Sequence, residues 1–214
     1  MRRSGIARIV AFGDSLTRGE TGFTPYPSEE PAFSYPEYLH GFAQAYLGSH
    51  ASDVKVEVVN KGVNGDLTSG MLDRFSRDVV AENADHVIIL GGTNDIGWGL
   101  ELATIIHNLI RIYDGALNGG ISAVACAVPS ILGFDELIPP RLELNRAIRA
   151  EAETRKMAFL DLFKPTADPL NNRLLQVYSS DGLHLNSKGY ERMASYIFDN
   201  WLKAVLSHRL ALSS

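Results

Sequence analysis

The sequence predicts an α/β fold in which a parallel sheet is covered by helices on both faces. Short apolar runs alternate along the chain with longer segments whose apolar residues recur every three or four positions. The runs are continuous rather than alternating, which is typical of strands buried on both faces. Because strands and helices alternate over the whole chain, we expect right-handed crossovers and one domain spanning residues 1–214.

Each element of this prediction has its own signal in the sequence. A long connection, residues 21–36, contains four prolines, and a loop of that length inside a domain is commonly functional or mobile. Cys126 lies among small apolar residues of the fourth run and is expected in the core. The predicted strands are residues 9–12, 54–60, 87–90, 123–128 and 159–162, and the amphipathic stripes cover residues 39–47, 102–113, 144–152 and 190–201.

Composition excludes several classes of function. The formal charge of −5, without a cluster of lysines and arginines, argues against nucleic acid or an anionic membrane as the main partner. No stretch approaches the length of about 18 apolar residues needed for membrane insertion. With one cysteine, no secretory signal and no metal-ligand spacing, we expect a cytoplasmic protein without a metal or cofactor.

Polar residues that could carry chemistry follow the predicted strands, where ligands bind in sheets of this kind. Ser15 follows the first strand in a Gly-Asp-Ser turn, which suits a nucleophile, although serine also commonly caps a helix. After the second strand, Gly62 would let a backbone N–H approach a ligand closely. An ordinary turn is the alternative for Gly62.

Two further strand ends supply the remaining parts. Asn94, after the third strand, offers neutral N–H donors to a developing oxyanion, or else belongs to a turn in which Asp95 caps a helix. Asp181 precedes His184 by three residues and can fold back onto its Nδ1–H, leaving Nε2 to accept a proton from serine. The alternative is a surface turn in which Asn186 or the next serine caps a helix.

A nucleophile, a base, an orienting acid and oxyanion donors are together the requirements of acyl transfer. With these residues in this order, the chain resembles the GDSL family, also called SGNH hydrolases. Matching blocks extend from residue 12 to residue 186. The blocks contain Ser15, Gly62, Asn94 and His184, with Asp181 before the histidine.

The resemblance implies a flavodoxin-like three-layer α/β/α sandwich with a central five-stranded parallel sheet. It also implies hydrolysis of esters or thioesters without a metal. The catalytic residues would be Ser15, Asp181 and His184. The oxyanion hole would consist of the Ser15 N–H, the Gly62 N–H and the Asn94 amide.

The expected substrate is a small-molecule carboxylic ester with a short to medium acyl chain. Trp98, flanked by glycines just after Asn94, and Phe134, in the segment after the fourth strand, are candidate walls of the acyl pocket. A carbohydrate O-deacetylase, a thioesterase or lysophospholipase and an acyltransferase are alternatives on the same fold. A non-catalytic ligand-binding protein is the alternative from another class, but it would not need Asp181 and His184 together.

Overall fold

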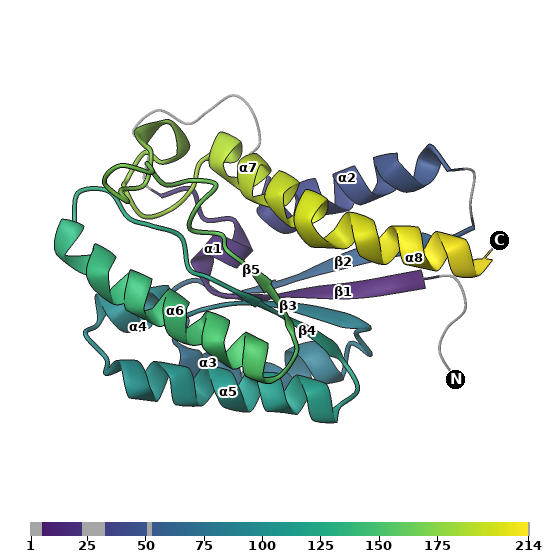
Figure 1. The fold of residues 1–214 in the computed structure, drawn as a ribbon, viewed down its shortest axis with the longest axis horizontal. Helices are drawn as coiled ribbons and strands as arrows, with labels where there is room; N and C mark the ends of the chain where they lie inside the picture. The colour runs from purple at the N-terminus through teal and green to yellow at the C-terminus, as the bar shows by residue number, and fades with distance from the viewer. Residues whose placement is uncertain (1–5, 23–32, 51–52, 214) are drawn as a thin grey trace.

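A five-stranded parallel sheet with the strand order β2-β1-β3-β4-β5 forms the middle layer of the structure (Figure 1). The computed structural model describes residues 6–22, 33–50 and 53–213. This strand order is that of flavodoxin-like folds, so the predicted fold class is confirmed. The strands are β1 (Ile6–Gly13), β2 (Lys55–Gly62), β3 (His86–Leu90), β4 (Ser122–Cys126) and β5 (Ala158–Leu160).

Helices cover both faces of this sheet (Figure 1). One layer contains α2 (Tyr35–Gly48), α7 (Ser187–Ile197) and α8 (Lys203–Ser213), with a π-helical segment, Phe198–Leu202, between the last two. The other layer contains α3 (Thr68–Phe75), α5 (Leu102–Asn118) and α6 (Ile138–Thr154). Two short helices, α1 (Ser15–Arg18) and α4 (Thr93–Gly97), directly follow β1 and β3.

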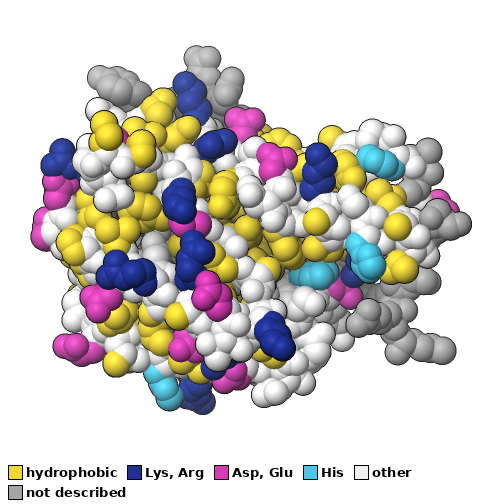
Figure 2. Space-filling view, viewed as in Figure 1, with side chains coloured by type: hydrophobic (Ala, Val, Ile, Leu, Met, Phe, Trp, Pro, Cys, Tyr) yellow, Lys and Arg dark blue, Asp and Glu magenta, His cyan; other side chains and the backbone are white. Residues whose placement is uncertain are grey.

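The central strands β1, β3 and β4 are buried on both faces, as their continuous apolar runs predict, whereas the edge strand β2 is half-buried along most of its length. In β1, four successive side chains from Ile9 to Phe12 are completely buried, although neighbours in a strand point to opposite faces. Cys126 lies in the core, as expected, and Trp201 is also buried there. On the molecular face shown in Figure 2, lysine and arginine side chains are interspersed with aspartate and glutamate. Within the described ranges, no helix is long and apolar enough to cross a membrane.

The element boundaries differ from the prediction in a few places. Pro36 does not belong to the long connection, because it lies in the first turn of α2, where a missing N–H costs nothing. Ser34 begins that helix in a reciprocal pair with Glu37. Helices α3 and α8 lie outside the predicted stripes. The prolines at 25, 27 and 31 fall outside the described residues.

Candidate active site

The turn after β1 places Ser15 at the centre of the sheet edge. The connection after β1 leads to β2 on one side of the sheet, and the connection after β3 leads to β4 on the other. Ligands bind at the switch point between two such strands. Asp14 caps α1, since its Oδ1 accepts a hydrogen bond from the Leu16 N–H at 3.0 Å. The capping role considered for Ser15 therefore belongs to Asp14, and Ser15 occupies the first position of the helix.

Ser15, His184 and Asp181 form a continuous chain of hydrogen-bonding contacts. The Ser15 Oγ lies 3.0 Å from His184 Nε2, although the two residues are 169 positions apart. On the other side of the ring, His184 Nδ1 lies 2.7 Å from Asp181 Oδ2. A carboxylate at Nδ1 favours the tautomer with its proton there, which leaves Nε2 free to accept the serine proton.

The loop before α7 holds Asp181 and His184 in this arrangement. Asp181 Oδ1 accepts hydrogen bonds from the backbone N–H groups of Leu183 and His184, at 2.9 and 2.8 Å. Ser179 Oγ donates to the His184 carbonyl at 2.6 Å. Burial opposes ionisation of Asp181, but hydrogen bonds from the His184 ring and these backbone groups outweigh it and lower the Asp181 pKa. Asp181 is therefore an anion at neutral pH.

Asn186 also caps α7, because its Oδ1 accepts a hydrogen bond from the Gly189 N–H at 3.1 Å. The helix cap that the sequence offered as the alternative to the Asp181–His184 contact is therefore present together with that contact.

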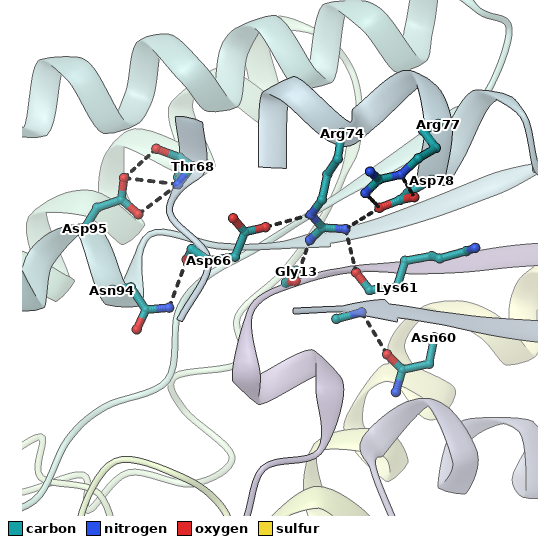
Figure 3. A network of polar contacts seen from close by, with 11 residues as sticks. Gly13, Asn60, Lys61, Asp66, Thr68, Arg74, Arg77, Asp78, Asn94 and Asp95 are labelled. Atoms are coloured by element: carbon teal, nitrogen blue, oxygen red, sulfur yellow. Dashed lines mark hydrogen bonds and ion pairs between the residues drawn. The ribbon is translucent and has the colours of Figure 1, made fainter. Parts of the chain in front are cut away.

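Asn94 lies at the start of α4 with its amide directed at the loop after β2 (Figure 3). Its Nδ2 donates to the Asp66 carbonyl at 2.9 Å. Among the described residues, no other contact uses the second N–H of this amide. Asp95 does not cap α4; its carboxylate accepts hydrogen bonds from the Thr68 N–H and Oγ1 at the start of α3.

The prediction for Gly62 is not supported by the geometry. Its N–H already donates to Asn60 Oδ1 at 2.9 Å, so in this arrangement it has no hydrogen to offer a substrate. The turn that follows contains a second glycine, Gly65, with a φ of +72°. Within the described part of the chain, no hydrogen bond uses the Gly65 N–H.

The sequence patterns did not single out Gly65 as a candidate donor. The sequence signal that could have indicated it is the Asn64-Gly65 pair, which is typical of a turn. Gly65 is the third residue of this turn, a position that favours glycine, and the Asp66 N–H closes the turn by donating to the Val63 carbonyl.

Residues 11–192 match the GDSL-like lipase/acylhydrolase family. The chain belongs to this family. Membership places it among hydrolases with esterase or acylhydrolase activity. An acetylxylan esterase from Geobacillus stearothermophilus is 23% identical over 204 residues, which cover 87% of this chain and 90% of that protein.

Solved structures support the fold. A structure of a putative lipolytic protein of the G-D-S-L family from Desulfitobacterium hafniense superposes with a TM-score of 0.71 and 25% identity. The match covers 89% of this chain and 97% of that one. A catalytic mutant of the Geobacillus stearothermophilus acetylxylan esterase superposes with a TM-score of 0.76 and 19% identity, covering 94% and 96% of the two chains.

The two candidate pocket walls of this GDSL hydrolase are exposed. Trp98 ends α4 with 77% of its surface exposed, and Phe134 lies after β4 with 50% exposed. Neither side chain is part of the hydrophobic core. Both follow strands whose carboxyl ends lie at the same edge as Ser15. Contact with an acyl group stays a prediction for both residues.

Asp14, next to the serine, is a buried carboxyl group with one oxygen, Oδ2, that has no hydrogen-bond partner. Burial raises its pKa from 3.8 to about 7, against the opposing effects of the Leu16 N–H and His184. Since this pKa is higher in the folded than in the unfolded chain, the folded protein binds more protons between these values. The free energy of unfolding therefore falls as the pH rises through that window.

We expect Asp14→Asn to remove this pH dependence, because asparagine keeps the cap on the Leu16 N–H and does not ionise. The free energy of unfolding of the variant minus that of the wild type should be about 3 kcal/mol larger at pH 8 than at pH 5, measured by urea titration. Asp168→Asn is the control, since Asp168 Oδ1 accepts the Leu170 N–H at 2.8 Å but Asp168 is only half-buried. A difference between Asp14→Asn and wild type that is equal at both pH values would contradict the prediction.

Proposed function

We propose that this protein is a serine esterase that works through an acyl-enzyme. The observation that carries the proposal is the chain of contacts from Ser15 Oγ to His184 Nε2 and from His184 Nδ1 to Asp181 Oδ2. Ser15 attacks the ester carbonyl while His184 takes its proton, and the histidine then protonates the departing alcohol. A water activated by His184 releases the acid and regenerates Ser15.

The negative charge that develops on the carbonyl oxygen needs N–H donors. Ser15 supplies its backbone N–H from the first turn of α1, where such groups lack a helical partner. Asn94 supplies the N–H of its amide that does not bind the Asp66 carbonyl. For the third donor we assign Gly65 in place of Gly62, because the Gly65 N–H is unused among the described residues and the Gly62 N–H is not.

Serine activation of this kind needs no metal, so we expect full activity in the presence of a chelator. Among the described residues, no group of three or more histidine, cysteine, aspartate or glutamate side chains could hold a metal ion. The cytoplasmic location stays a prediction.

The proposed substrates are carboxylic esters with short to medium acyl chains. The exposed Trp98 and Phe134 can shield only a few methylene groups, each worth about 0.8 kcal/mol when buried. A second candidate is the removal of acetyl groups from carbohydrate. It is favoured by the acetylxylan esterase that is 23% identical to this chain over 87% of its length.

We expect kcat/KM for p-nitrophenyl esters to rise over the first acyl carbons and then to level off or fall before palmitate. An acetylated xylo-oligosaccharide, an acyl-CoA and a competing alcohol are assayed beside the esters. Faster deacetylation of the sugar than of p-nitrophenyl acetate would favour the carbohydrate esterase. A steady rise to palmitate would contradict the acyl-chain prediction, and absence of turnover on every substrate would contradict the esterase.

A further inference from the structure

Arg74, in α3, is a nearly buried arginine with four hydrogen bonds, and its side chain is only 8% exposed (Figure 3). Its guanidinium also lies over the Phe12 ring, 4.3 Å from the centroid. Burying an arginine costs free energy unless partners satisfy its donors.

The partners of Arg74 join three parts of the sheet edge that carry the proposed active site. Nη2 donates to the Gly13 carbonyl at the end of β1, 2.8 Å away and two residues before Ser15. Nη1 donates to the Lys61 carbonyl near the end of β2, at 2.9 Å. Nε donates to Asp66 Oδ2, in the loop that follows β2, at 2.7 Å. One side chain thus sets the position of this loop relative to the nucleophile turn.

Asp66 makes contacts in two directions. Its carboxylate binds Arg74, and its backbone carbonyl accepts the hydrogen bond from Asn94 Nδ2 (Figure 3). A Cβ on residue 70 would lie only 2.2 Å from Asp66 Oδ1, so the glycine at this position leaves room for the carboxylate. The orientation of the Asn94 amide therefore depends on a residue that Arg74 holds.

We propose that Arg74 is a positioning residue for the oxyanion hole, acting through Asp66 on the Asn94 amide. The inference rests on the proposed esterase function. Donors to an oxyanion must be aimed before the reaction, and a displacement of about 1 Å can cost roughly 10²-fold in rate. An arginine suits this task, because its planar fork reaches several acceptors at fixed angles where a lysine offers one compact charge.

The second carboxylate partner of Arg74, Asp78, makes it possible to distinguish a purely structural role from the proposed positioning role. The Arg74 Nη1 lies 3.0 Å from Asp78 Oδ2, and the Asp66 and Asp78 side chains are similarly exposed, at 11% and 13%. Asp78 belongs to the π-helical segment Ser76–Val80 after α3. Among the described residues, the hydrogen bonds of its carboxylate go to Arg74 and Arg77 and none goes to the loop after β2. The matched pair Asp66→Asn and Asp78→Asn therefore removes one carboxylate of Arg74 each time, with and without a link to Asn94.

The experiment measures kcat and KM on the best ester of the panel, together with urea unfolding, under conditions where each variant is fully folded. We expect Asp66→Asn to lower kcat about 10-fold with KM little changed, because the lost interaction acts in the transition state. Asp78→Asn should lose stability and keep the wild-type kcat. Arg74→Lys should lower kcat at least as far as Asp66→Asn.

The loss of kcat in Asp66→Asn must also depend on the presence of Asn94. In an Asn94→Ala background, Asp66→Asn should cost little further kcat, since the donor that it orients is already gone. Equal kcat for Asp66→Asn and wild type, equal losses for Asp66→Asn and Asp78→Asn, or losses that add fully to Asn94→Ala would each overturn the inference. An inactive wild type would instead contradict the esterase itself, so the two failures are distinguishable.

Discussion

Ser15→Ala is expected to lower kcat by about 10⁵-fold or more, because no other group replaces the nucleophile held 3.0 Å from His184 Nε2. The rest of the site would still bind and polarise the ester, leaving a residual acceleration of about 10³ over the reaction in water. Steady-state kinetics on p-nitrophenyl acetate measures the loss. Mass spectrometry after reaction with a serine-directed phosphonate locates the modified residue.

Ser187→Ala is the matched control for the nucleophile. Ser187 opens α7 directly after its capping residue, as Ser15 opens α1 after Asp14, so the two substitutions perturb the same helix position. The control should keep the wild-type kcat and be labelled at Ser15. Labelling of the Ser15→Ala variant at a different serine would refute the assignment of the nucleophile.

Asp181→Asn is expected to lower kcat by about 10⁴-fold while the loop keeps its structure. Asp181 Oδ1 accepts two backbone N–H groups, so an asparagine oxygen would stay there and its NH₂ would face His184 Nδ1. The ring would then accept at Nδ1 and carry its proton on Nε2, where it cannot take a proton from Ser15. The loss should appear in kcat, with KM and the unfolding midpoint close to wild type.

Asp168→Asn also serves as the control for this substitution, because Asp168 accepts a backbone N–H two residues ahead, at Leu170, as Asp181 does at Leu183. It should be fully active. If Asp181→Asn were equally active, the carboxylate would have only a structural role in the loop, and the orientation of His184 would have to come from elsewhere.

Several parts of the site could be predicted from the sequence because they depend on local order along the chain. Ser15 and Asn94 directly follow continuous apolar strands, and parallel strands bring such residues to one edge. Asp181 reaches His184 within one loop, so a spacing of three residues carries that contact. The strands could be predicted because burial on both faces requires apolar side chains at successive positions, which gives continuous apolar runs in the sequence.

Helix α3 was not predicted, because its packing depends on contacts with distant segments rather than on local order along the chain. The helix is eight residues long and buries a charged side chain, Arg74, where an apolar residue would have completed a stripe. The acceptors for this charge, at Gly13, Lys61 and Asp66, come from three separate segments. Periodicity detects burial of apolar groups, and it gives no sign of an arginine satisfied by distant carbonyls.

By itself, the sequence determined the layered α/β architecture, and it predicted the nucleophile and the acid–base pair, since each follows from a pattern within one strand, one turn or one loop. The choice of Gly65 over Gly62 as the proposed oxyanion donor rests on the tertiary structure alone. Both glycines follow the predicted strand 54–60, and no sequence pattern distinguishes their backbone N–H groups. What separates them is the Asn60 side chain, which folds back onto the Gly62 N–H, while no described residue accepts the Gly65 N–H. Whether a backbone N–H is free for an oxyanion depends on every neighbouring acceptor, and those are assembled only when the chain folds.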